Sequence, residues 1–153
     1  MATNHQVYNI TQYLPHRKPM LLVDIITEIS QEHVVTSYHI PEHSIFLHNN
    51  IFQESGVIEN MAQTCSAIVG QNYFNPEIAT ENIKTNVIGF ISGIKKVEFF
   101  ALPNQGEQLK TAAELISRFE GEDYSLCTMN ATCFCDAQKI ATATLNLFLQ
   151  KTE

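Results

Sequence analysis

The sequence lacks any hydrophobic run as long as a membrane span, and its first residues lack the layout of a signal peptide. We therefore expect a cytoplasmic protein without a membrane span. The chain has 4 cysteines, but no two of them have CxxC spacing. A zinc or redox site is therefore not expected, and we expect no bound metal. Buried free thiols are the simpler interpretation of Cys65, Cys127, Cys133 and Cys135.

Positive charge is scarce in this sequence. The chain has 9 Lys and Arg residues against 16 Asp and Glu residues, and its formal net charge is −7. Proteins that bind phosphate backbones usually present a basic face, so a nucleic-acid partner is not expected. Hydrophobic residues, in contrast, make up 44% of the 153 positions, which is enough for one domain with a core. We expect a single domain over residues 1–153, in which residues 1–12 are loose.

The stretch at residues 54–70 has the clearest periodicity. Its apolar residues recur with a helical period, at positions 57, 58, 61, 62, 65, 68 and 69. This spacing predicts a central helix with Ser55 as its N-cap and Gly70 at its end. Glu59 lies in the first turn, and Gln63 follows one turn later on the same side. A carboxylate on so apolar a helix either answers the helix dipole or takes part in chemistry.

Most of the remaining chain has the patterns of strands. Before the helix we expect a helical turn at 10–14, a strand at 21–26, a turn at 28–32, a strand at 34–38 and an irregular segment at 42–53. After it we expect a loop at 71–85, a strand at 86–100, and three alternating strands at 109–119, 127–135 and 141–149. In the first of these three, Leu109 and Phe119 are expected to share the buried side. The economical arrangement is an α+β fold in which a curved antiparallel sheet wraps one long helix.

Three segments together resemble the hotdog-fold 3-hydroxyacyl-ACP dehydratases. They are Leu14–Asp24, with its Leu-Pro-His-Arg start, Glu59–Gln63, which reads Glu-Asn-Met-Ala-Gln, and Gly89–Leu109, with its Pro-Asn-Gln-Gly-Glu turn. The resemblance covers nearly the whole chain, from about Tyr13 to Leu149. Residues 54–64 are also similar to the dehydratase-like branch associated with aryl-polyene and flexirubin-type pigment synthesis. The resemblance therefore implies a hotdog fold and the elimination of water from a 3-hydroxyacyl thioester, to give a trans-2-enoyl thioester.

The resemblance also implies roles for individual residues. In the family, a histidine ahead of the helix acts as the base, and the helix glutamate of the partner subunit protonates the departing hydroxyl. Glu59 matches that glutamate, and His48 is the nearest histidine, although the segment between them is about three residues shorter than in typical members. Gly56 is the candidate backbone donor to the thioester carbonyl. Further substrate contacts are expected from residues at the helix and the next strand, namely Val57, Gln63, Phe90 and Gly93.

Cofactors and partners follow from the same resemblance. Every step is a proton transfer, so no cofactor is expected. The expected partners are an acyl carrier protein or a CoA thioester, and a second copy of the chain in a homodimer or a higher oligomer. Because exposed sheet edges are often covered by dimerisation, we expect the dimer to join through the strand at residues 88–97.

Two other functions fit the same fold. A hotdog acyl thioesterase could use Glu59 to activate water without any histidine. A non-catalytic acyl-binding subunit would only shape an acyl tunnel beside an active partner. Whether His48 points at Glu59 of a neighbouring subunit across a pocket distinguishes these alternatives from a dehydratase.

The other histidines have plainer interpretations. His16 belongs to the resembling segment, where it is expected to cap backbone groups in a turn near the first strand. His43 is a more distant candidate for the base. His5, His33 and His39 carry no motif and are expected to be solvated.

Some charged residues also have two interpretations. Glu54 is either a second carboxylate at the helix mouth or, more simply, a charge that favours the helix N-terminus. Arg17-Lys18 and Lys95-Lys96 are adjacent basic pairs in an acidic chain. Either pair could receive an acidic carrier protein, although such pairs usually lie on a solvated face.

Overall fold

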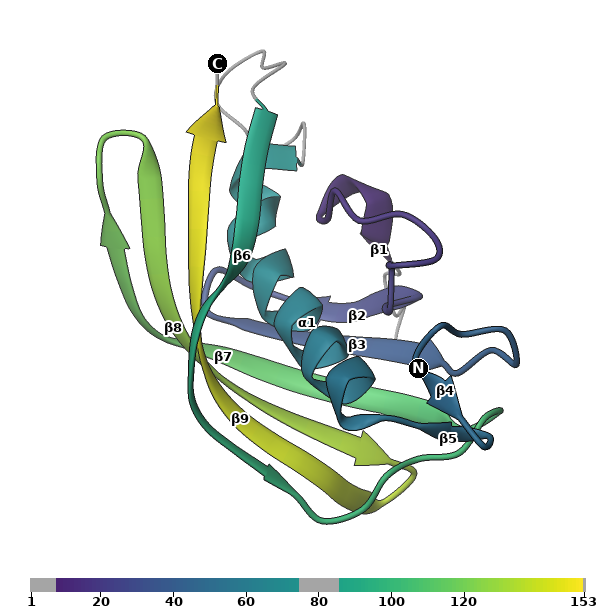
Figure 1. The fold of residues 1–153 in the computed structure, drawn as a ribbon. Coiled ribbons are helices and arrows are strands. Elements are labelled where there is room, and N and C mark those ends of the chain that lie inside the picture. The colour runs from purple at the N-terminus through teal and green to yellow at the C-terminus, as the bar shows by residue number, and fades with distance from the viewer. Residues whose placement is uncertain (1–7, 75–85, 153) are drawn as a thin grey trace, which may run out of the picture.

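A computed structural model describes residues 8–74 and 86–152 (Figure 1). Before the long helix, the elements are β1 (Tyr8–Asn9), the 3-10 turn η1 (Ile10–Gln12), β2 (Ile25–Ile29), β3 (His33–His39), β4 (Leu47–His48) and β5 (Ile51–Phe52). The helix α1 (Glu54–Phe74) follows, and the chain then forms β6 (Asn86–Phe99), β7 (Gln108–Glu120), β8 (Tyr124–Cys135) and β9 (Gln138–Thr152). None of the helices in the described ranges is long and apolar enough to cross a membrane.

The main sheet has the strand order β1-β2-β3-β7-β8-β9-β6, and all of its pairs are antiparallel. Figure 1 shows this sheet curving around α1, which lies in its concavity. The inner face of the sheet meets the helix in the core, where Met61, Cys65 and Ile68 are fully buried together with Met129 and Leu145. The predicted α+β arrangement of one long helix wrapped by a curved antiparallel sheet is therefore confirmed.

The helix is longer at both ends than its sequence pattern predicts. It begins at Glu54, so Ser55 lies inside it, and the Gln53 carbonyl accepts the N–H groups of Gly56 and Val57 at 3.0 and 3.1 Å. The helix also continues past Gly70 to Phe74. Tertiary contacts hold this last turn, since the Gln71 side chain donates to the Ser30 carbonyl at 2.8 Å. The loop expected at 71–85 is therefore wrong for 71–74, and its remainder lies outside the described residues.

Several shorter expectations are corrected at the start of the chain. Residues 8–12, expected to be loose, form β1 and η1, and Ile10 is buried; residues 1–7 lie outside the described part. The strand expected at 21–26 begins only at Ile25 and runs on to Ile29, into the expected turn. Leu22 and Val23 are buried nonetheless, because this segment rests on α1 rather than on a neighbouring strand.

Two further corrections concern the segment before α1 and strand β7. The segment at 42–53 contains the β4–β5 hairpin, where Asn49 and Asn50 adopt positive φ angles of 49° and 62°. In β7, the pairing register shifts between Leu115 and Ser117. This bulge turns Phe119 to the outer face, where its side chain is 59% exposed, instead of the buried side that strict alternation predicts.

Candidate active site

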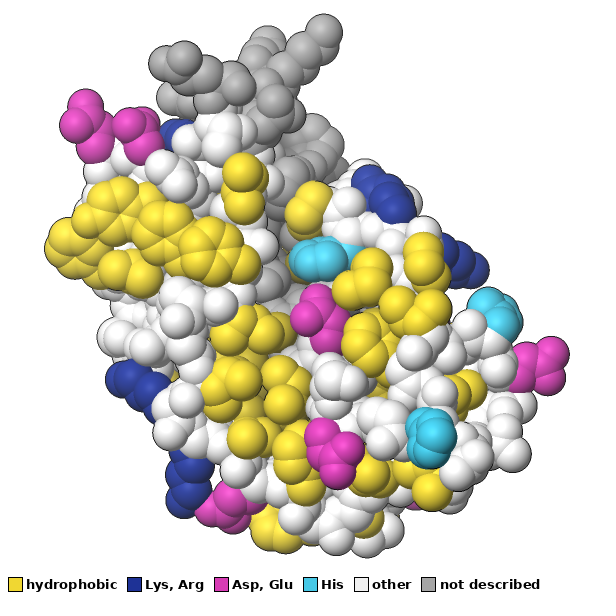
Figure 2. Space-filling view, viewed as in Figure 1, with side chains coloured by type: hydrophobic (Ala, Val, Ile, Leu, Met, Phe, Trp, Pro, Cys, Tyr) yellow, Lys and Arg dark blue, Asp and Glu magenta, His cyan; other side chains and the backbone are white. Residues whose placement is uncertain are grey.

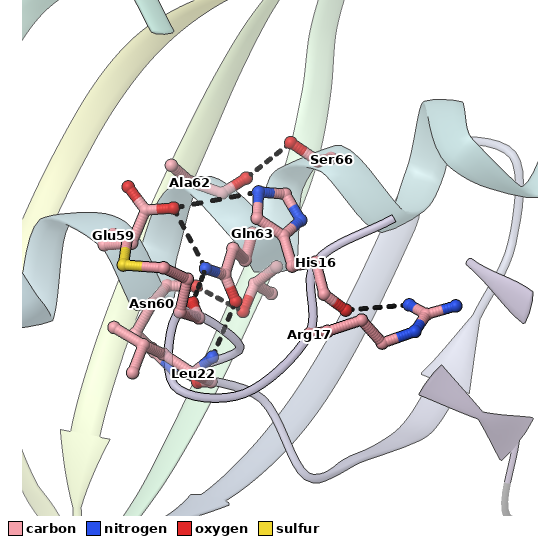
Figure 3. Close-up of polar contacts among 10 residues, drawn as sticks. His16, Arg17, Leu22, Glu59, Asn60, Ala62, Gln63 and Ser66 are labelled. Atoms are coloured by element: carbon pink, nitrogen blue, oxygen red, sulfur yellow. Dashed lines mark hydrogen bonds and ion pairs between the residues drawn. The ribbon is translucent and has the colours of Figure 1, made fainter. Parts of the chain in front are cut away.

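The loop between η1 and β2 carries His16 across the surface of α1. Arg17 folds back within this loop, and its Nη1 donates to the carbonyls of Leu14 at 2.9 Å and His16 at 2.7 Å. The loop backbone has no strand to pair with here, so its polar groups need other partners. Side chains of α1 supply them (Figure 3).

Two amides of α1 fasten the loop. Gln63 accepts the Leu22 N–H on its Oε1 at 2.8 Å and donates from Nε2 to the Met20 carbonyl at 2.7 Å. Asn60 donates from Nδ2 to the Leu22 carbonyl at 2.7 Å, while its Oδ1 accepts the Thr111 hydroxyl at the same distance. Both amides are buried, so these bonds are strong constraints on the position of the loop.

This fastening brings a histidine and a carboxylate together. His16 Nε2 lies 3.9 Å from Glu59 Oε1, and both side chains are about a quarter exposed, at 27% and 26%. The same Glu59 oxygen accepts a hydrogen bond from Gln63 Nε2 at 2.9 Å. Figure 3 shows His16, Glu59 and Gln63 converging from the loop and from one side of the helix.

The surroundings of His16 favour its neutral form. Burial lowers the pKa of His16 below its ordinary value of 6.5; the Glu59 carboxylate raises that pKa in part, and the Arg17 guanidinium lowers it. A neutral imidazole near pH 7 can accept a proton, as a general base must. His16 Nδ1 is buried and has no hydrogen-bond partner among the described residues. A buried polar group without a protein partner calls for an explanation, and a catalytic role is one such explanation.

A cavity of about 250 Å³ opens beside this pair. Its polar end holds His16, Glu59 and Gln63, and Tyr13 also lines it. Its remaining wall is formed by small and apolar residues of α1, β6 and β9: Ala62, Ser66, Gly70, Val87, Gly89, Phe90, Ile91, Leu147 and Leu149, with Leu14 and Pro15 of the loop. In Figure 2, a histidine and an acidic side chain meet at a hollow between hydrophobic surfaces. The shape suits an apolar chain with a reactive polar end.

The structure brings only some of the predicted site residues to this cavity. Glu59, Gln63 and Phe90 line it, whereas His48, Gly56, Val57 and Gly93 are not among its lining residues. His48 lies exposed on β4, paired with Ile51 of β5. Its predicted role as base stays a prediction that depends on a partner subunit.

The predicted contacts at the start of the helix also stay predictions. Gly56 lies against the β4–β5 hairpin: a Cβ there would come within 2.6 Å of the Phe52 ring and 2.8 Å of Phe46 Cβ. Its N–H already donates to the Gln53 carbonyl. Val57 is fully buried in the core.

The sequence pattern predicts a turn at His16 but does not predict its position beside Glu59. The signal was present, since His16 is part of the Leu-Pro-His-Arg segment of the resemblance. The helix side chains that hold the loop are 38 to 43 residues away along the chain, however, so the proximity depends on tertiary structure.

The structure also places the cysteines and the candidate metal ligands. Among the described residues, no cluster of three or more His, Cys, Asp or Glu side chains could hold a metal ion. The four cysteines are free and buried, as predicted. Burial raises the pKa of Cys65 to about 12, which leaves it a poor nucleophile.

Comparison with known proteins agrees with the motifs. A family model described as ApeP-like, ApeP dehydratase, matches residues 8–153. The 3-hydroxyacyl-[acyl-carrier-protein] dehydratase FabZ of Acinetobacter baumannii is 30% identical over 153 residues, which cover 97% of this chain and 98% of that protein. The FabZ of Streptococcus pyogenes serotype M3 is 30% identical over 117 residues, covering 73% of this chain and 78% of that protein.

Solved structures share the fold. The dehydratase heterocomplex ApeI:P from Xenorhabdus doucetiae matches with a TM-score of 0.74 at 21% identity, over 95% of this chain and 92% of that chain. The PaaI protein from the phenylacetic acid degradation operon of E. coli matches with a TM-score of 0.56 at 9% identity, over 80% and 79% of the two chains. The predicted hotdog fold and the predicted dehydratase resemblance are both confirmed.

Proposed function

The chain belongs to the ApeP-like dehydratase family and is an enzyme of the hydro-lyase class, and on that premise we propose that it removes water from a 3-hydroxyacyl-ACP to give a trans-2-enoyl-ACP. The observation that carries the proposal is the pair of His16 and Glu59, 3.9 Å apart at the polar end of an apolar cavity. The names of the FabZ relatives support an acyl carrier protein as the carrier.

The proposed reaction moves two protons. His16 Nε2 takes the proton from C2 of the acyl chain, and the Glu59 carboxylic acid gives its proton to the hydroxyl on C3. The C3–O bond breaks, water departs, and a double bond forms between C2 and C3. The pair is left as imidazolium and carboxylate, which attract each other across 3.9 Å. Loss of one proton from His16 to water and uptake of one proton by Glu59 restore the starting state.

His16 is the base that this arrangement favours over His48. It faces Glu59 within one chain, and burial keeps its imidazole neutral. His48 is exposed on the β4–β5 hairpin and is not among the residues that line the cavity beside Glu59. The pairing within one chain differs from the pattern implied by the family resemblance, in which the glutamate comes from the partner subunit.

The acyl chain is proposed to lie along α1. Ala62, Ser66 and Gly70 follow Glu59 on the cavity side of the helix, and Leu147 and Leu149 face them from β9. Small side chains on the helix leave room between helix and sheet, and the leucines give an apolar wall. The reacting end of the substrate would then lie at Glu59, with its tail toward the C-terminal end of the helix.

The carrier protein is proposed to dock beside the loop. Arg17 and Lys18 are exposed and directly follow His16, so an acidic carrier protein would be attracted to the polar end of the cavity. The other basic pair is less suited, because Lys96 Nζ already contacts Glu98 at 2.8 Å. We place the reaction in the cytoplasm.

We further propose a homodimer through β6. This strand pairs only with β9 in the described sheet, and its 14 residues leave one edge unpaired. Ile88, Phe90 and Ile94 are about half exposed along it, and an uncovered apolar edge favours association. The structurally similar ApeI:P is a heterocomplex by its description, so light scattering of the purified chain at micromolar concentration decides whether this chain associates with itself.

The reaction is tested with a panel of 3-hydroxyacyl-ACP substrates and analysis of the acyl products. We expect enoyl thioester that is still attached to the carrier. Free acid as the main product would instead indicate a thioesterase. No conversion of any 3-hydroxyacyl or acyl thioester would contradict the proposal and favour a non-catalytic acyl-binding subunit.

A further inference from the structure

Gln63 uses every polar group of its amide. Its two N–H bonds go to the Met20 carbonyl at 2.7 Å and to Glu59 Oε1 at 2.9 Å, and its Oε1 accepts the Leu22 N–H at 2.8 Å. The side chain is 1% exposed, so no water replaces these partners at the surface. The orientation of the amide is also determined. A flip would place the amide NH₂ against the Leu22 N–H and its oxygen against two other oxygens.

We infer that Gln63 is a positioning residue of the dehydration. Its one amide fixes the position of the base, His16, and determines which oxygen of the acid, Glu59, carries the proton. This inference rests on the proposed function. Met20 and Leu22 follow His16 by only four and six residues, so fixing their backbone fixes the short segment that carries the imidazole. The contacts between loop and helix thus connect His16 to Glu59, Glu59 to Gln63, and Gln63 to Met20 of the loop that carries His16.

The contact with Glu59 has a chemical consequence. An N–H donor stabilises the oxygen that carries no proton, since that oxygen is the stronger acceptor. The Gln63 N–H therefore favours Glu59 Oε1 as the carbonyl oxygen of the acid and leaves the transferable proton on Oε2. Without Gln63, the carboxyl group can rotate and present either oxygen to the substrate.

Asn60 provides a matched comparison within the same loop. It is fully buried and donates to the Leu22 carbonyl at 2.7 Å, so it also holds the loop. Its side-chain hydrogen bonds in the described structure go to Leu22 and Thr111 and not to the Glu59 carboxylate. Replacing each amide by an apolar side chain of similar shape gives Gln63→Met and Asn60→Leu. Both variants weaken the loop anchor, and only the first removes the hydrogen bond to Glu59.

The kinetic test measures kcat and KM for both variants on the substrate that the wild type converts. We expect Gln63→Met to lower kcat by about 10²-fold with little change in KM, because misplacement of reacting groups acts on the chemical step. Asn60→Leu should lose less than about tenfold. Equal losses in kcat for the two variants, or a Gln63→Met effect confined to KM, would overturn the inference.

A second measurement needs no turnover and so separates this inference from the proposed function. The imidazole of His16 is titrated by NMR in the wild type and in both variants. The charged groups that act on it are Glu59 from α1 and Arg17 from its own loop. We expect the His16 titration to move to higher pH in Gln63→Met, as the loop loosens and burial decreases, and to move less in Asn60→Leu.

An unchanged His16 titration in a folded Gln63→Met protein would contradict the positioning role. Thermal unfolding checks the fold of each variant. If Gln63→Met does not fold, Gln63→Glu serves in its place: it keeps an oxygen for the Leu22 N–H and loses the N–H donors to Glu59 and to the Met20 carbonyl. That variant should lose kcat as Gln63→Met does, and wild-type kcat in Gln63→Glu would overturn the inference. A wild type without dehydratase activity refutes the proposed function, while the titration still tests the placement of His16.

Discussion

Two segments each offer a histidine near the N-terminal half of α1, and they are held in different ways. The loop at 15–22 has its backbone bonded to Asn60 and Gln63 of the helix, and His16 is mostly buried beside Glu59. The hairpin at 47–52 bonds to itself, to its own flanks and to the turn at residues 103–105, and His48 is exposed. The difference teaches that burial and anchoring by the helix, rather than closeness to the helix in sequence, select the candidate base.

The largest expected effect comes from Glu59→Gln. The amide keeps the shape of the side chain but cannot donate the proton that the leaving hydroxyl needs. General acid–base groups contribute about 10²–10⁴-fold, so the rate of enoyl-ACP formation should fall by that factor while the circular dichroism spectrum is unchanged. Near-wild-type turnover would mean that Glu59 only interacts favourably with the helix dipole.

Substitution of the two histidines tests the comparison itself. His16→Gln should lower kcat by about 10²–10⁴-fold, because no base remains for the C2 proton. His48→Gln, at an exposed hairpin position, should leave kcat close to that of the wild type. The reverse pattern would assign the base to His48 of a partner subunit, as the sequence motif alone predicts.

A glycine substitution probes the hairpin without touching the cavity. An alanine Cβ at Gly56 would lie 2.6 Å from the Phe52 ring, so Gly56→Ala should lower the free energy of unfolding by about 1–3 kcal/mol. The control is Gly93→Ala, where the Cβ would meet Asn146 at an ordinary 3.7 Å, and little change is expected. Denaturant unfolding measures both. If the hairpin lies outside the site, the folded fraction of Gly56→Ala should have the kcat of the wild type. A loss of kcat in that folded fraction would place the hairpin in the site.

The smallest expected effect is on the pH profile. Because burial holds the pKa of His16 below 6.5, the acid limb of kcat/KM should lie below pH 6.5. The Arg17 guanidinium contributes to this lowering, so Arg17→Ala raises the pKa of His16 and moves the acid limb to higher pH. Lys18→Ala is the neighbouring control, and its limb should coincide with that of the wild type. A shift in the Lys18 variant alone would contradict the assignment.

The periodicity of the sequence predicts α1 and the long strands because their side chains alternate between core and solvent. It fails where a contact distant in sequence overrides the pattern. The bulge before Ser117 turns Phe119 outward, and Gln71, bonded to Ser30, carries the helix beyond Gly70. Glu59 and Gln63 could be selected from their motif. His16 could not, because its place beside Glu59 depends on how Gln63 and Asn60 bind the loop backbone.

The central claim is that His16 and Glu59 act together as the base and the acid of one site. NMR titration of His16 in the wild type and in Glu59→Gln tests this claim most directly. Since the Glu59 carboxylate raises the pKa of His16, its removal should move the His16 titration to lower pH. A His16 titration that is the same in the folded Glu59→Gln variant as in the wild type would contradict the account.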